Sequence, residues 1–324
     1  NVKSIHKLSI TLERIFFMQT QRFNSLNNFL RQRHGEKVIK LSIDGGFTCP
    51  NRDGRVATKG CTFCSSHGSG DFTPKEKGDI TRQLESAVSL LSAKWGESKK
   101  YIAYFQSYSN TYAPVEVLRA KYEEALAFPG VVGLAIATRP DCLDDEIIDY
   151  LSELSTRTHL WVELGLQTIH EDTAKFFNRG YSLNCFDEAV SKLHAKNIET
   201  VVHLILGLPY ETREQMLASA RYVSKLPLQG IKLHMLHILD NAPLGKYYLE
   251  NPFPILSEEE YIALIGEILC ILPPKLVIHR LTGDGPAAHL IAPLWTKNKK
   301  KVLNDLNRYL KEADIYQGKS LNTY

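Results

Sequence analysis

Apolar segments alternate with amphipathic segments along most of the chain. The apolar segments predict β-strands at residues 37–43, 101–106, 131–138, 159–167, 199–207 and 230–238, with a further strand at 275–281. Helical spacing of apolar residues predicts a helix near 79–93, and further helices are expected from Pro114 and over 144–154. Strands this apolar need cover on both faces, so the order of elements predicts an α/β protein with a parallel sheet.

The composition indicates one sizeable domain. The chain has 324 residues and 44% apolar content, which is enough to bury a large core. We expect a domain over residues 22–313, preceded by an N-terminal extension at 1–21 and followed by a tail at 314–324. No apolar run reaches the length of a membrane span. Three scattered cysteines predict reduced core thiols and a cytoplasmic protein: Cys142, Cys185 and Cys270.

The net charge of +3 is unevenly distributed along the chain. Residues 1–60 carry 11 Lys and Arg against 4 Asp and Glu, and residues 270–324 carry 9 against 4, so the middle of the chain is acidic. Basic ends could form a phosphate-binding surface. They could equally be solvated faces that keep the protein soluble. Charge alone therefore does not identify a nucleic acid as the substrate.

Three cysteines lie close together in the polar, Gly-rich segment DGGFTCPNRDGRVATKGCTFC. These are Cys49, Cys61 and Cys64. Soft thiolates grouped on such a loop predict a metal site rather than packing. A structural zinc or iron–sulfur site normally takes four protein ligands. Three thiolates therefore leave one coordination position open for a substrate or cofactor.

Other interpretations of the cysteines carry less weight. A disulfide would leave one thiol over, and the sequence shows no secretory segment. Packing in the core is disfavoured because turn-forming residues follow Cys49. A structural zinc completed by His67 has allowed ligand types and stays open as an alternative.

This segment resembles the cluster loop of radical S-adenosylmethionine (SAM) enzymes, in the branch related to the radical domain of the Elongator catalytic subunit. FTCPNRDG followed by GCTFC carries the resemblance, with eleven residues between Cys49 and Cys61 where the common spacing has three. The resemblance implies a partial (β/α)6-type TIM-like barrel in which Cys49, Cys61 and Cys64 hold one 4Fe–4S cluster. The open iron would bind SAM, and its cleavage would give a 5′-deoxyadenosyl radical.

Later segments appear in the order that the family requires. They are TRPD at 138–141, E-x-G-x-Q at 163–167 and I-x-G-L-P at 205–209, and Tyr210 stands where the family has Gly. The resemblance implies a set of SAM-binding residues: Phe63, Gln106, Ser107, Arg139, Glu163, Gln167, Gly207 and Pro209. Gln106 and Ser107 stand where many members carry Gly-Gly-Glu.

Two of these segments have structural alternatives. Arg139 could form a simple salt bridge to Asp141 or Asp144. Thr212 and Gln215 form a predicted capping box for the next helix, so part of that motif is structural.

Candidate substrate residues lie on the last strands. Alternation places Lys232 and His234 on one face of the strand at 230–238, with His237 on the other. The segment IHRLTGDGP places Arg280 and Asp284 on a loop near the barrel mouth. We predict Lys232, His234, Arg280 and Asp284 as catalytic residues, with ordinary surface or supporting roles as the alternative.

The segments PNRDG, NTYAP and IHRLTGDGP resemble those of a small bacterial group of Elongator-related radical SAM proteins. The resemblance implies tRNA as the substrate and conversion of wobble 5-carboxymethylaminomethyluridine to 5-aminomethyluridine. It also implies an electron donor such as flavodoxin or ferredoxin. Two other classes stay open: a radical SAM enzyme acting on a small molecule or protein, and a non-catalytic zinc- or cluster-containing RNA-binding module.

Overall fold

One parallel sheet organises the protein. The computed structural model describes residues 21–65, 68, 70, 73, 79–95, 98–283 and 285–322. Within these residues, seven parallel strands form the sheet in the order β1-β2-β3-β4-β5-β6-β8. Their bounds are β1 (Val38–Ile43), β2 (Lys100–Phe105), β3 (Val131–Thr138), β4 (His159–Gln167), β5 (Glu199–Leu206), β6 (Gly230–Met235) and β8 (Val277–Arg280).

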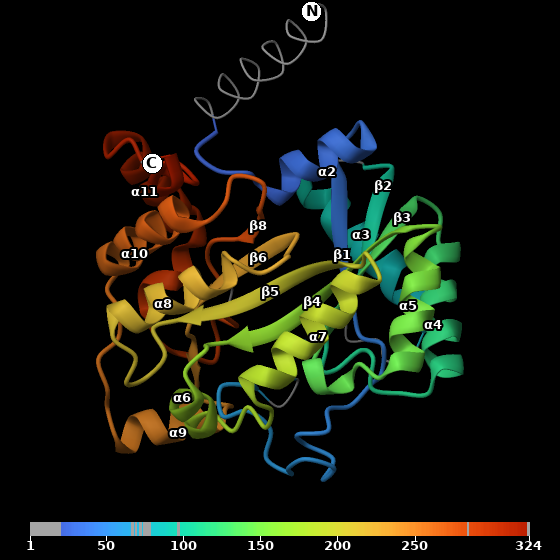
Figure 1. Cartoon of the computed structure of the whole chain (residues 1–324). Coiled ribbons are helices and arrows are strands. Elements are labelled where there is room, and N and C mark those ends of the chain that lie inside the picture. Colours follow the sequence, from blue (N-terminus) through green and yellow to red (C-terminus); the bar gives the residue numbers. More distant parts are fainter. Residues whose placement is uncertain are drawn as a thin grey trace, which may run out of the picture.

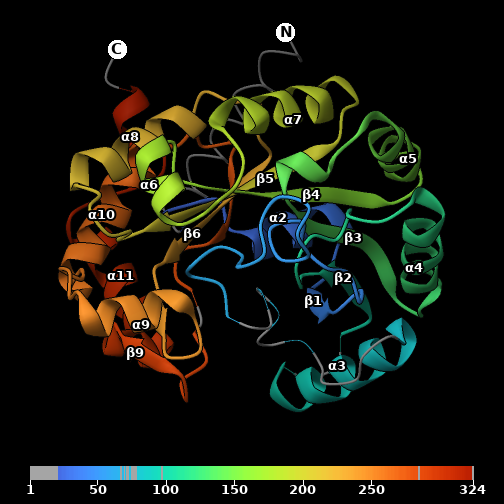
Figure 2. The same cartoon turned by 90° about the horizontal axis from the view of Figure 1, so that it is seen from below.

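The sheet curls into an open half-barrel (Figures 1 and 2). This confirms the predicted α/β fold, a partial TIM-like barrel with a parallel sheet. The additional strand expected at 275–281 is β8, which pairs with β6. The segment predicted as one strand at 230–238 forms two strands instead. Strand β6 ends at Met235, and Ile238 begins β7 (Ile238–Leu239). Strand β7 pairs antiparallel with β9 (Leu290–Ala292).

Helices cover the outer face of the half-barrel, and Figure 2 shows α3, α4, α5, α7 and α8 around its outside. The expected helices are present, and α8 begins with the predicted Thr212–Gln215 capping box. Within the described residues, no helix combines the length and apolarity needed to span a membrane. The helix bounds are α2 (Leu26–His34), α3 (Ile80–Trp95), α4 (Val115–Ala127), α5 (Asp145–Ser155), α6 (Glu171–Phe176), α7 (Leu183–Ala195), α8 (Arg213–Val223), α9 (Pro243–Glu250), α10 (Glu258–Ile271) and α11 (Lys299–Glu312), with short 3-10 helices at Pro140–Cys142, Leu294–Asn298 and Lys319–Asn322.

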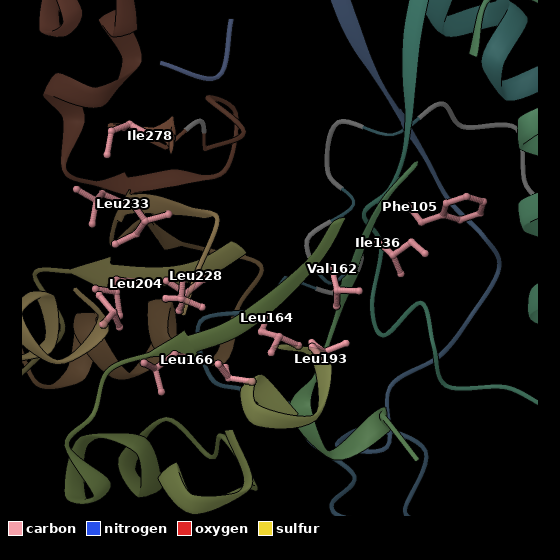
Figure 3. Packing of buried hydrophobic residues seen from close by; sticks show 14 of the residues in the cluster. Phe105, Ile136, Val162, Leu164, Leu166, Leu193, Leu204, Leu228, Leu233 and Ile278 are labelled. Atoms are coloured by element: carbon pink, nitrogen blue, oxygen red, sulfur yellow. The ribbon is translucent and has the colours of Figure 1, made fainter. Parts of the chain in front are cut away.

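Alternate residues of each strand pack outward beneath these helices. On β4 the outward residues are Val162, Leu164 and Leu166, all fully buried (Figure 3). They share one core with residues of neighbouring strands, such as Ile136 and Leu204. Because successive strand residues point to opposite faces, the residues between them face the inside of the half-barrel.

The inner face changes from apolar to polar along the strands. At its amino end, Leu30 of α2 packs with Ile102 and Trp161 and closes that end of the half-barrel. Further along, polar side chains point inward from five different strands. They are Lys40, Tyr104, Glu163, His203 and Lys232.

The residues after 313 pack against the body of the fold. Gln317 is fully buried and donates to the carbonyl oxygens of Pro273 (2.7 Å) and Leu276 (2.8 Å). Its side-chain oxygen accepts from the backbone N–H of Asn24 at 2.9 Å. This residue therefore ties both ends of the described chain to the segment that precedes β8.

Candidate active site

A cavity of about 280 Å³ opens at the carboxyl edge of the sheet, where the active sites of β/α barrels form. The cysteine loop that follows β1 contributes to its wall, and Figure 2 shows this loop, in blue, crossing the centre of the half-barrel. Most residues predicted for the site line this one cavity. They are Cys49, Cys61, Phe63, Cys64, Gln106, Arg139, Glu163, Gln167, Lys232, His234 and Arg280.

The three loop cysteines are free, partly exposed thiols. Hydrogen bonding with Cys64 lowers the pKa of Cys61 to about 7, and the positive charge of Arg139 contributes. By contrast, burial raises the pKa of Cys142, which keeps that thiol protonated. The same hydrogen bond and burial raise the pKa of Cys64, so Cys61 is the thiol of this pair that ionises more readily. The thiolate is the form of cysteine that binds a soft metal.

Backbone and amide contacts hold the cysteine loop in place. Asn51 is fully buried and donates from Nδ2 to the carbonyl of Asn178 (2.6 Å), with Cys61 Sγ at 3.5 Å. Asn178 in turn donates to the carbonyl of Gly60 at 2.8 Å. Thr62 is bonded through its backbone to residues beside α6 and in α9. The sequence suggested only a turn at Asn51, and its anchoring role depends on contacts with residues more than a hundred positions away.

A buried carboxylate lies in the floor of the cavity. Glu163 accepts from Trp161 Nε1 at 2.9 Å and from His203 Nε2 at 2.9 Å, and it forms an ion pair with Lys232. Lys40 Nζ lies 3.4 Å from its other side. Burial alone would raise the pKa of Glu163, but Lys232 and Lys40 hold that pKa well below its usual range. The carboxylate is therefore ionised and shared by two lysines.

Arg139 takes part in the salt bridge that the sequence left open. Its Nε and Nη2 donate to Asp141 at 2.8 and 2.7 Å, and its Nη1 donates to the carbonyl of Arg179 at 2.9 Å. The same guanidinium lies 4.7 Å from the ring of Tyr181 and lines the cavity. Tyr181 also donates to Gln167 Oε1 at 3.1 Å. The ion pair thus fixes the position of a cationic group in the cavity wall.

Three of the predicted SAM residues do not line the cavity. Ser107 is buried next to Gln106, and its hydroxyl has no hydrogen-bond partner among the described residues. Gly207 has a φ of 81°, and its N–H lies 3.1 Å from Met216 Sδ, so it shapes the turn after β5. Pro209 is buried in the same turn. Tyr210, which stands where the family has Gly, adopts a φ of 66° that suits Gly better than Tyr.

Three further residues of the sequence analysis are His237, His67 and Asp284. His237 was expected on the face opposite Lys232, and this is wrong, because it lines the same cavity. The alternation stops since β6 ends at Met235, and the chain turns before His237. Asp284 and His67 lie outside the described residues.

The structure thus places three thiols, which are soft metal ligands, around a cavity at the carboxyl edge of a parallel half-barrel, where the active sites of β/α barrels form. The sequence matches the Radical SAM superfamily over residues 51–223 and the Radical SAM C-terminal domain over residues 228–312. The chain belongs to the radical SAM superfamily and is a radical SAM enzyme. This sets aside the non-catalytic RNA-binding module.

Similar proteins cover nearly the whole chain. The chain is 49% identical to the Bacillus subtilis protein YtqA over 299 residues, covering 92% of each. It is 36% identical to the Escherichia coli protein YhcC over 306 residues, covering 94% of this chain and 97% of YhcC. A shorter match of 30% over 166 residues covers 50% of this chain and 36% of a tRNA uridine(34) acetyltransferase of Dehalococcoides mccartyi.

A solved structure supports the fold. The archaeal Elp3 of Methanocaldococcus infernus aligns with a TM-score of 0.65 at 16% sequence identity. The alignment covers 86% of this chain and 64% of the Elp3 chain. At this identity, the likeness concerns the arrangement of the half-barrel alone.

Proposed function

We propose that Cys49, Cys61 and Cys64 hold a 4Fe–4S cluster, that SAM binds beside it, and that the enzyme modifies the wobble uridine of tRNA. One observation carries this proposal: all three thiols line the cavity that inward-facing residues of the strands also line. When bound, the cluster and SAM supply a 5′-deoxyadenosyl radical. The protein must then orient SAM, position the substrate and exclude water.

The number of loop thiols favours a cluster with one open position over a structural zinc site, which normally takes four protein ligands. In the part of the chain that the structure describes, no three His, Cys, Asp or Glu side chains lie close enough together to hold one ion. The ligands of a single zinc ion all lie within about 2.3 Å of the same atom. Each thiolate of a cluster binds a different iron, so cluster ligands are spread more widely.

Four of the predicted SAM residues have positions that suit a role in binding SAM. All four line the cavity: Phe63 from within the cysteine loop, Gln106 directly after β2, Arg139 directly after β3 and Gln167 at the end of β4. The Arg139 guanidinium is a fixed cation for a carboxylate, and Phe63 offers an apolar ring for the adenine. Glu163 reaches the cavity as an ionised group already in contact with Lys232.

The tRNA part of the proposal rests on the Elongator-like relatives and on the chemistry of the cavity wall. The side chain of 5-carboxymethylaminomethyluridine has a carboxylate, and Lys232 and Arg280 line the wall that a substrate would reach. An anticodon loop presents an unpaired base that can enter such a cavity without melting of a duplex.

The proposed reaction balances with SAM as the two-electron oxidant. SAM, the substituted amine of the wobble side chain and water give methionine, 5′-deoxyadenosine, the primary amine, glyoxylate and a proton. A one-electron donor such as flavodoxin or ferredoxin would reduce the cluster before the first turnover. The carbon–hydrogen bond to be broken is the one between the amine and the carboxylate, so this carbon must face SAM.

Deletion of the gene should raise 5-carboxymethylaminomethyluridine in tRNA and remove 5-aminomethyluridine and nucleosides made from it. Mass spectrometry of nucleosides from bulk tRNA of cells with and without the gene measures this. A plasmid copy of the gene should restore the profile, and the same copy with Cys61→Ala should not. Identical wobble uridines in both strains would refute tRNA as the substrate and favour a small molecule or protein.

A further inference from the structure

Positive charge exceeds negative charge in the floor of the cavity. Glu163 is the one acidic side chain among the described residues that line the cavity. Lys232 and Lys40 both contact this single carboxylate. The strand register adds a third cation, because Arg280 of β8 pairs in register with Lys232 of β6. One carboxylate therefore faces three cationic side chains.

Arg280 is the cation of this group that lacks an anionic partner. No described acidic side chain forms an ion pair with it, whereas Lys232 and Lys40 share Glu163. Burial lowers the pKa of Lys232 and of His234, and the charge of Arg280 lowers both further. An arginine guanidinium is a planar cation with five N–H donors in a rigid fork. The guanidinium N–H groups of Arg280 therefore face the cavity, where an anionic group of a ligand can accept from them.

A neutral histidine lies beside these cations. His234 lines the cavity, and its Nε2 is buried without a hydrogen-bond partner among the described residues. Burial and the nearby positive charges hold the pKa of His234 well below its usual range. Its ring can accept a hydrogen bond from an amine without adding charge. The wall thus combines a fork for an anion with a neutral acceptor for an N–H group.

We propose that Arg280 is the specificity-determining residue of a carboxylate subsite, which binds the terminal carboxylate of the substrate side chain while His234 accepts from its amine. This inference rests on the proposed function. A guanidinium fork binds a carboxylate through two parallel hydrogen bonds. Glu163 pairs with Lys232, which is buried, whereas Arg280 is partly exposed and forms no ion pair with a described residue. The methionine carboxylate of SAM is the other source of the same chemistry, and the test separates the two.

The experiment compares two anticodon stem-loops that differ only in the wobble side chain. One carries 5-carboxymethylaminomethyluridine and the other 5-methylaminomethyluridine, which lacks the carboxylate. Their Kd values are measured on unreduced holoenzyme with SAM bound, so that no reaction occurs. Wild-type protein should bind the carboxylate form roughly 10- to 100-fold more tightly, as expected for loss of a hydrogen bond to a charged group.

The substitution Arg280→Gln should remove most of this preference, and Arg280→Lys should keep part of it. Arg308→Gln, at an exposed arginine of α11, is the matched control and should keep all of it. If Arg280→Gln retained the full preference, the proposed carboxylate subsite would be refuted, and the proposed tRNA function would be unaffected. If Arg280→Gln weakened SAM binding and left the preference unchanged, Arg280 would serve the methionine carboxylate. If wild-type protein bound neither stem-loop, the proposed function itself would fail.

Discussion

Substitution of any one of Cys49, Cys61 and Cys64 by Ala will yield protein that binds no stable iron–sulfur cluster. The three thiols line one cavity, and a cluster held by two thiolates loses a third of its protein ligands. Iron and sulfide content after anaerobic reconstitution, together with the visible absorption spectrum, measures the effect.

Cysteines outside the loop provide the matched controls. Cys142→Ala, Cys185→Ala and Cys270→Ala should retain wild-type iron, because these thiols do not line the cavity. A full complement of iron in Cys61→Ala would show that the ligands have been assigned wrongly. Loss of iron in Cys185→Ala, on the outer helix α7, would have the same consequence.

Glu163→Gln will destabilise the protein by about 3–5 kcal/mol, the usual cost of leaving a buried charge without its partner. The carboxylate is fully buried and contacts Lys232, Lys40 and His203. The isosteric amide preserves the shape of the side chain but leaves both lysines without a counter-ion. Urea unfolding of the wild type and the variant at pH 7 measures the difference.

The pH dependence of this variant distinguishes a charge effect from a packing defect. Burial lowers the pKa of Lys232, so in the variant the unfolded chain binds more protons than the folded chain. Stability of Glu163→Gln should therefore rise as the pH approaches the ordinary pKa of lysine. Glu153→Gln, at an exposed pair with Arg119, should change stability little. An equal loss for Glu163→Gln at pH 6 and pH 9 would contradict the ionic account.

Strong periodicity made most of the sheet predictable from the sequence. The strands at 131–138 and 159–167 agree with β3 and β4 at both ends. Their residues face the outer core or the cavity by simple alternation, which also placed Lys232 and His234 correctly on one face. The same rule failed at His237, because alternation holds only while the strand continues and β6 ends two residues earlier.

The polar floor of the cavity was only partly predictable. Glu163 and Lys232 were identified as polar groups in apolar strands, but Lys40 and His203 carry the same signal and were missed. Both are polar residues at inward positions of β1 and β5. What the sequence could not provide is the register between strands, which brings Lys40, Glu163 and Lys232 together from three strands that are distant in the chain.

Loop anchors were the least predictable part of the site. Asn51 and Asn178 hold the cysteine loop through contacts across 127 sequence positions. A single sequence gives no signal for such a pair, since each residue alone is typical of a turn. Arg139 differs, because its structural alternative was visible in the sequence and is confirmed by the pair with Asp141. The same side chain lines the cavity, and its role in binding SAM stays a prediction.

A single-turnover incubation of reduced holoenzyme with SAM and tRNA tests the central claim most directly. Mass spectrometry measures 5′-deoxyadenosine, S-adenosylhomocysteine and the wobble nucleosides in the same sample. The account predicts 5′-deoxyadenosine and 5-aminomethyluridine in equal amounts, with glyoxylate released. Formation of S-adenosylhomocysteine alone, or of 5′-deoxyadenosine with the wobble uridine unchanged, would contradict it.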